Sequence, residues 1–178
     1  MTTLPLTTAQ TTCYAKVLDF LEQIHQVDNH HSDPHRESQF LKTKKPHRFS
    51  FTAVPPSISL VIAGDDNQLG ASSDLHSELH IEIAPWLEDR SMIRLWAWLT
   101  ETEVRHEKTL LYLLRKNEKF QFGGFSMAAH GGIRFQVSLL GETCQINEFV
   151  LALAEVINAI DNYLPEIQHQ LGFTPEQV

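Results

Sequence analysis

The fold is decided by residues 79–99, which read LHIEIAPWLEDRSMIRLWAWL. Every second residue of 79–84 is apolar, the pattern of a strand with one buried and one solvent-facing side. Residues 87–91 supply a turn, and residues 92–99 then alternate again. In this second strand both sides carry large side chains, because Trp96 and Trp98 alternate with aliphatic residues. We therefore expect it to lie centrally in a sheet or to have its second side partly covered.

Toward the N-terminus, the pattern predicts a helix and then a loop. Residues 11–27 carry apolar side chains three and four positions apart, as on one side of a helix, and Asp28-Asn29 ends it. Residues 28–48 are dominated by Asp, Asn, His, Ser, Pro and Lys. Such a segment buries too little apolar surface to offset its ordering entropy, so we expect a flexible loop or insertion at 28–48.

Two more strands are predicted between this loop and residue 79. Residues 49–53 and 58–62 alternate with period two, and Pro55 and Pro56 separate them because proline cannot donate to a strand ladder. Residues 64–76 are polar and rich in turn formers, which predicts a second loop.

Toward the C-terminus, we expect a helix followed by a hairpin. Thr100 or Thr102 can cap a helix over residues 103–117. The turn His130-Gly131-Gly132 would join two short strands, because glycine adopts positive φ angles at little steric cost. The buried stripe of the helix would consist of Val104, Leu110, Leu111 and Leu114.

The last helix is predicted over residues 146–164, where apolar residues keep helical spacing for five turns. We expect Asn147 to be its N-cap, with Ile146 and Leu151 forming a hydrophobic staple. Pro165 should kink or end the helix.

These elements follow the order α-β-β-β-β-α-β-β-α, without a repeated strand–helix–strand crossover. We therefore predict an α+β fold with a mostly antiparallel sheet and helices on one face. The length of 178 residues favours a single domain over 1–178, with a frayed tail at 173–178.

Composition predicts a cytoplasmic protein. The formal charge is −8, no apolar run is long enough to span a membrane, and the N-terminal residues do not read as a signal peptide. Cys13 and Cys144 do not make a disulfide framework and are expected to be reduced thiols. We expect no nucleic-acid partner, because the basic residues Lys42, Lys44, Lys45, His47 and Arg48 gather only in one loop.

Four short motifs in the second half occur in a familiar order: LLRKN at 113–117, FGGFSM at 122–127, IRFQV at 133–137 and DNYLP at 161–165. They resemble the YbjN-like group of small bacterial proteins, which shares a fold with the type III secretion chaperones, and the match covers mainly 79–167. The resemblance implies a type III secretion chaperone-like fold, dimerisation, no catalysis and binding of another polypeptide. It carries over no site residue, and residues 28–62 lie outside its pattern.

Ten histidines raise the question of a metal site. His25, His30, His31 and His35 cluster with acidic residues, and His31 and His35 have the i, i+4 spacing of a metal pair on a helix. Pro34 argues against that helix, so we expect a solvated polar loop and no cofactor. Residues 65–76 fit a calcium loop only in part, because His76 stands where a bidentate Glu is needed.

No catalytic motif is present in the sequence. Cys144 precedes a helix whose dipole could lower the pKa of its thiol, and His106 and His130 are conceivable bases, but nothing in the sequence brings them together. A small buried thiol is the simpler interpretation.

The tryptophan side of residues 92–99 is the best candidate for a binding surface. Met92, Arg94, Trp96 and Trp98 would share the side that the helices do not need, and exposed apolar patches mark interaction sites. We expect a non-catalytic protein-binding, chaperone-like or regulatory module that acts through this sheet face, its second helix and homodimerisation, and that also binds another protein. The alternative is a metal-dependent or small-ligand enzyme that uses the histidine-rich loop 25–35.

Overall fold

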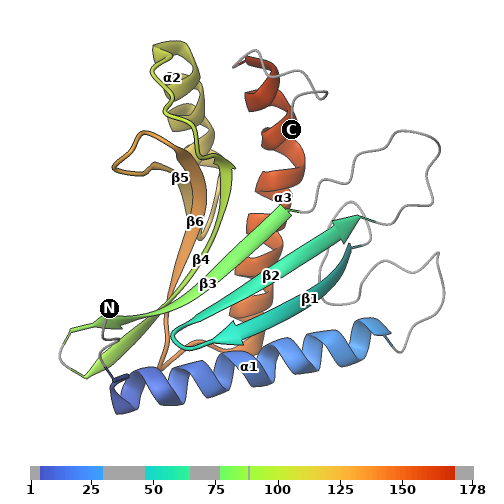
Figure 1. Ribbon diagram of the computed structural model, residues 1–178, viewed down its shortest axis with the longest axis vertical. Coiled ribbons are helices and arrows are strands. Elements are labelled where there is room, and N and C mark those ends of the chain that lie inside the picture. Colours follow the sequence, from blue (N-terminus) through green and yellow to red (C-terminus); the bar gives the residue numbers. More distant parts are fainter. Residues whose placement is uncertain (1–4, 30–46, 65–76, 88, 171–178) are drawn as a thin grey trace.

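The computed structural model describes residues 5–29, 47–64, 77–87 and 89–170 (Figure 1). Their order confirms the predicted α+β arrangement. The elements are α1 (Thr8–Asn29), β1 (His47–Val54), β2 (Ser57–Gly64), β3 (Ser77–Trp86), β4 (Arg90–Thr100), α2 (Glu107–Lys116), the 3-10 turn η1 (Asn117–Lys119), β5 (Gly123–Met127), β6 (Ile133–Leu140) and α3 (Ile146–Gln170).

The strands form one sheet in the order β1-β2-β3-β4-β6-β5, and every neighbouring pair is antiparallel. β4 lies between β3 and β6, so the prediction of a central strand at 92–99 is confirmed. The register places Ile58, Ile81, Leu95 and Val137 opposite one another across four strands. All four side chains are at most 1% exposed, so they form one buried row.

Helices α1 and α3 cover this apolar side of the sheet, which we call the core face. Leu21 and Ile24 of α1 and Phe149 and Leu153 of α3 are completely buried against it. Each such side chain contributes about 1.5–3 kcal/mol through removal from water. In Figure 1, α1 crosses one end of the sheet while α3 runs along it. The expected one-sided packing is therefore present for α1 and α3.

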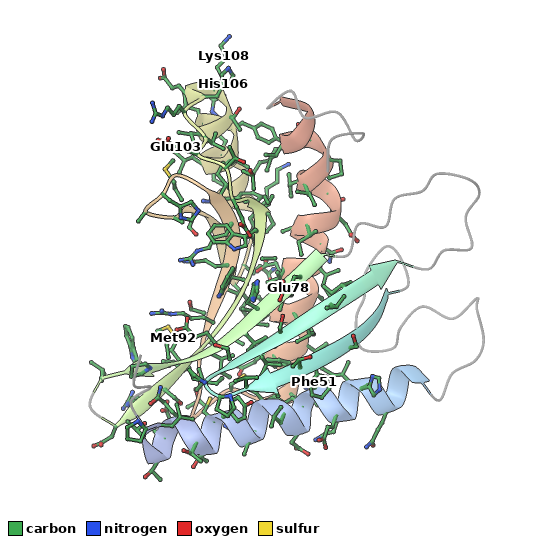
Figure 2. All side chains as sticks on the ribbon, viewed as in Figure 1. Phe51, Glu78, Met92, Glu103, His106 and Lys108 are labelled. Atoms are coloured by element: carbon green, nitrogen blue, oxygen red, sulfur yellow. The ribbon has the colours of Figure 1, made fainter. Side chains whose placement is uncertain are left out.

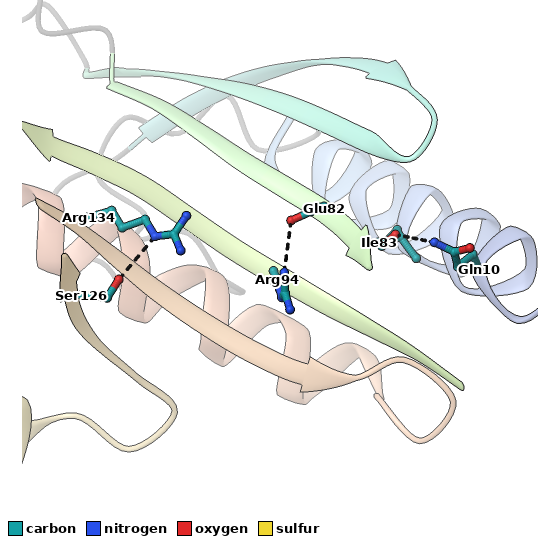
Figure 3. A network of polar contacts seen from close by, with 6 residues as sticks. All are labelled: Gln10, Glu82, Ile83, Arg94, Ser126 and Arg134. Atoms are coloured by element: carbon teal, nitrogen blue, oxygen red, sulfur yellow. Dashed lines mark hydrogen bonds and ion pairs between the residues drawn. The ribbon is translucent and has the colours of Figure 1, made fainter. Parts of the chain in front are cut away.

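Helix α1 begins at Thr8, three residues before the predicted start, because Thr7 and Gln10 form a capping box. The Thr7 hydroxyl accepts a hydrogen bond from the Gln10 backbone N–H at 3.2 Å, and the Gln10 carbonyl Oε1 accepts one from the Thr7 N–H at 3.0 Å. Gln10 Nε2 also donates to the Ile83 carbonyl at 3.1 Å, which ties the helix to β3 (Figure 3).

Helix α2 begins at Glu107, four residues after the predicted start. The predicted cap at Thr100 or Thr102 is wrong, because residues 103–106 are not helical and the Val104 N–H donates to the Gly131 carbonyl at 3.0 Å. The predicted stripe is also partly wrong: Thr109 and Leu113 are buried, whereas Leu111 and Leu114 are 45% and 63% exposed. Four leucines within 110–114 make the helix apolar on several sides, so periodicity could not select the buried one.

The β5–β6 hairpin turns where it was predicted, with Gly131 at a φ of +89°. The outer edge of β5 is closed by a side chain: Asn117 Oδ1 accepts from the Phe125 N–H at 2.7 Å, and Asn117 Nδ2 donates to the Phe125 carbonyl at 3.2 Å. The amide thus replaces a neighbouring strand at this edge. Gly124 makes room for it, because a Cβ there would lie 3.1 Å from Asn117 Oδ1.

Helix α3 begins at Ile146, so the predicted cap at Asn147 is wrong. The Gln145 carbonyl accepts the Phe149 N–H at 3.0 Å, and Glu148 Oε2 accepts the Gln145 N–H at 3.0 Å. The predicted staple is wrong as well, because Leu151 is 53% exposed.

Pro165 does not end α3, which continues to Gln170. Two anchors hold the last turns: Ile167 is completely buried, and the Glu166 carboxylate accepts a hydrogen bond from the Tyr112 hydroxyl of α2. These contacts offset the backbone hydrogen bond that proline cannot make.

Two predicted loops fall largely outside the described residues. Residues 28 and 29 end α1, residues 47 and 48 begin β1, and residues 30–46 between them are not described. Residue 64 ends β2, and residues 65–76 and the predicted tail at 173–178 are likewise not described.

Candidate interaction face of the sheet

The second side of the sheet, which we call the open face, carries aromatic and charged residues. Along β4, the buried Ile93, Leu95 and Ala97 alternate with residues that are exposed or half-buried. No helix of the described residues packs on this side. Glu78 and Met92 are labelled in Figure 2. The open face comprises Glu78, His80, Glu82, Met92, Arg94, Trp96, Trp98, Arg134, Gln136 and Ser138.

The four residues predicted for this site do share the open face. Met92, Trp96 and Trp98 are half-buried, and the Arg94 side chain is 45% exposed. The indoles are shielded by neighbouring side chains of the same face. The structure therefore brings the predicted residues together on one side of the sheet.

A row of four rings runs across the open face. His80 is stacked on Trp96 with ring centroids 4.1 Å apart, Trp96 meets Trp98 edge-to-face at 5.4 Å, and Trp98 meets His130 at 5.3 Å. The prediction omitted both histidines. Alternation places His80 on the same side as Trp96, which was a usable signal. No sequence pattern places His130 beside Trp98, because the β5–β6 turn carries it there.

The charges of the open face are arranged by strand. Arg94 on β4 lies 3.7 Å from the Glu82 carboxylate on β3, its partner in the register (Figure 3). Arg134 on β6 donates through Nε to the Ser126 hydroxyl at 3.3 Å, and its guanidinium carbon lies 5.6 Å from the Trp96 ring centroid. The Glu78 carboxylate accepts a hydrogen bond from Ser59. Exposed pairs of this kind contribute at most about 1 kcal/mol each to stability.

This arrangement favours a protein partner over an inserted planar ligand. Trp96 is flanked by His80 from β3 and by Arg134 from β6, so both neighbouring strands already place a side chain against its ring. A sugar or base would need a free ring face on which to stack. Trp, Met and Arg are instead residue types that are enriched in interface cores.

Helix α2 offers a smaller apolar surface. Leu111 and Leu114 are three positions apart on its outer side and are both exposed. Leu111 and Leu114 had been expected to face the core, and the expectation that the second helix takes part in binding stays a prediction.

A shallow hollow of about 360 Å³ lies beside α3, next to the segment that leads into β5. Phe122 and Leu151 line it and are 39% and 53% exposed. Its carboxylate, Glu155, already accepts the backbone N–H groups of Gln121 at 2.8 Å and Phe122 at 3.1 Å. This carboxylate therefore has a structural role in holding the segment on α3.

Cys144 is a buried thiol, as the simpler interpretation predicted. Burial raises its pKa to about 11, the charge of Glu148 adds to that effect, and Lys16 opposes it. The conceivable lowering of this pKa by the helix dipole is therefore wrong. His106 instead contacts Thr109 at 2.9 Å and His130 contacts Trp98.

The residues of the metal hypothesis lie mostly outside the described part of the chain. The residues that fall there are three histidines, the partial calcium loop and three lysines of the basic cluster: His30, His31, His35, 65–76, Lys42, Lys44 and Lys45. Within the described residues, no group of three or more His, Cys, Asp or Glu side chains could hold a metal ion.

Comparison of the sequence with models of protein families and with curated proteins found no match. The resemblance to the YbjN-like group therefore stays a prediction. Within the described residues, no helix is both long and apolar enough to span a membrane.

Proposed function

We propose that this protein is a non-catalytic protein-binding module, chaperone-like or regulatory in role, and that its open face is the binding surface. The single observation that carries the proposal is the Trp96–Trp98 pair on a sheet face that no described helix covers. Trp, Arg and Met are the residue types that dominate interface cores and binding hot spots.

Two further features support the proposal. The ring row gives the face a rigid aromatic centre, which lowers the entropy cost of binding because few rotamers are lost. The charged residues around it are largely exposed, as in the polar rim of an interface. The alternative of an enzyme built on the histidine-rich loop gains no support from the described residues.

Site-specific photocrosslinking tests this function. A photoreactive residue placed at Ser138, which is exposed on the open face, should form a covalent adduct with a protein partner. The same residue at Leu151, which is exposed on the outer side of α3, is the matched control and should give no adduct.

The adduct from Ser138 should disappear when Trp96 and Trp98 are both replaced by Ala in a variant that still folds. Equal adducts from the two positions, or none from either in lysate and in concentrated purified protein, would contradict the proposal.

A further inference from the structure

The charges of the open face are segregated about β4. Both carboxylates, Glu78 and Glu82, come from β3, whereas the guanidinium groups of Arg94 and Arg134 come from β4 and β6. The acidic side chains therefore lie on β3, on one side of the tryptophans. The basic side chains lie on β4, the strand of the tryptophans, and on β6 at its other side. A surface that is acidic on one side of a line and basic on the other can be complementary to itself.

The register shows which residues lie at the same height. Trp98 pairs with Arg134 across β4 and β6, and Leu79 pairs with Ala97 across β3 and β4, so Glu78 lies on the other side of Trp98. One row of the face therefore reads Glu78, Trp98, Arg134. The next row reads His80, Trp96, Gln136.

We propose that the occupant of the open face is a second copy of this chain, related by a two-fold axis that runs along β4. The inference rests on the proposed function, namely that the open face binds protein. A rotation of 180° about this axis places β3 of one copy over β6 of the other. Each residue keeps its position along the direction of β4. Glu78 of each copy then faces the partner's Arg134, and the tryptophans of the two copies meet on the axis.

The reach of the side chains fits this pairing. Packed sheets lie about 10 Å apart, which an extended glutamate and an extended arginine can bridge between them. The Glu78 carboxylate accepts the Ser59 hydroxyl and lies 3.9 Å from His80 Nδ1, yet its side chain is 56% exposed. Arg134 has no carboxylate within 4.0 Å among the described residues, so both side chains can take a further partner. Arg94 meets the partner's Arg94 near the axis, but each is neutralised by its own Glu82 at 3.7 Å.

The other two-fold arrangement of the same faces is disfavoured. An axis across the strands would lay β3 on the partner's β3 in reverse, which brings Glu78 opposite the partner's Glu82. Like charges facing each other in an interface are destabilising. The charge pattern therefore selects the axis along β4.

The available area is close to that of a stable interface. Together with Ser59 and Val61 of β2, which the register places beside His80 and Glu78, four strands spaced about 4.8 Å apart and about eight residues long cover roughly 500 Å² in projection, before side-chain relief is counted. Standard-size interfaces bury about 800 Å² of accessible surface per partner.

Charge reversal tests the axis directly. The wild type should sediment as a dimer at about 50 µM, whereas Glu78→Arg and Arg134→Glu should each weaken the dimer about tenfold or more, because each places two like-charged pairs in the interface. An equimolar mixture of the two variants should restore the dimer, because both pairs then join an Arg to a Glu. Lys108→Glu on α2, away from Glu78 in Figure 2, is the control and should dimerise like the wild type.

Circular dichroism should show that both variants keep the wild-type fold, and the restored mixture is itself evidence of folding. A dimer that tolerates either reversal, or a mixture that stays monomeric, would overturn the axis. A wild type that is monomeric at this concentration would overturn the second copy as occupant. The proposed function would survive that result if Ser138 still crosslinked to a different protein in a tryptophan-dependent way.

Discussion

The two faces of the sheet are built from alternate residues of the same strands, yet they are stabilised in different ways. On the core face, Leu95 and Phe135 are completely buried because α1 and α3 complete their surroundings. On the open face, the described residues that shield Trp96 are neighbouring side chains such as His80 and Arg134. Among the described residues, helices therefore cover the core face and leave the open face uncovered. Substitutions on the core face should therefore destabilise the fold, whereas substitutions on the open face should change association.

The largest effect is expected at Phe135, which is completely buried among Phe120 and Phe125. Phe135→Ala removes apolar contacts and leaves a cavity, so the free energy of unfolding should fall by about 3–5 kcal/mol. Urea denaturation followed by circular dichroism measures it. Leu114→Ala, at a residue 63% exposed, is the control and should change stability by less than about 0.5 kcal/mol. Equal losses in the two variants would break the distinction between core and surface.

Thiol reactivity should differ between the faces by about two orders of magnitude. Burial raises the pKa of Cys144 to about 11, so little thiolate exists at pH 8. A cysteine introduced as Ser138→Cys on the open face should ionise near its ordinary pKa of about 8.5 and react much faster with a disulfide reagent.

The rate at Cys144 should keep rising with pH above 9, whereas the rate at residue 138 should level off. The wild-type protein supplies the background from Cys13 and Cys144, which are both buried. Comparable rates at residue 138 and in this background would show that the core face is open to solvent.

Trp96→Ala should have a smaller effect on folding than Phe135→Ala but a larger one on association. Loss of the ring contacts to His80 and Trp98 should lower stability by about 1–2 kcal/mol, whereas loss of a central interface tryptophan should weaken binding by about 2 kcal/mol or more. Thermal denaturation and sedimentation equilibrium separate the two. Phe122→Ala, at an aromatic residue outside the open face, should leave association unchanged.

The smallest effect on stability is expected at the start of β4, where Ser91 contacts Glu142. The Ser91 backbone N–H donates to the Glu142 carboxylate at 2.5 Å, and this bond holds the pKa of Glu142 below its ordinary value. The bond therefore stabilises the fold above the ordinary pKa of Glu, and its contribution is lost as the pH falls through the lowered value.

Glu142→Gln should accordingly be slightly less stable than the wild type at pH 7, and the difference should shrink below about pH 4. Melting temperatures measured at both pH values test this. A difference that grows on acidification would show that the sign is wrong.

Much of the fold could be predicted because strand alternation is a local property. The pattern in residues 79–99 placed β3, β4 and the side to which Trp96 and Trp98 point. Helix starts were less predictable. The capping box of α1 has a sequence signature, Thr7 followed three residues later by Gln10. The late start of α2 has none, because it depends on the bond from Val104 to Gly131, which are distant in sequence.

The candidate site was predictable only as far as its position on β4. His80 could have been added from alternation, but the contact of His130 with Trp98 depends on how the β5–β6 turn folds back. Likewise, the sequence motif that ends at Asn117 does not reveal that its side chain closes the edge of β5.

The amino-acid sequence alone therefore determined the order of the elements and which side of the central strand is aromatic, because these follow from the periodicity of neighbouring residues. Which rings touch, which carboxylate Arg94 meets, and which leucines of α2 face water could be known from the folded structure alone. Those properties depend on distances between segments far apart in the chain, and packing alone sets these distances.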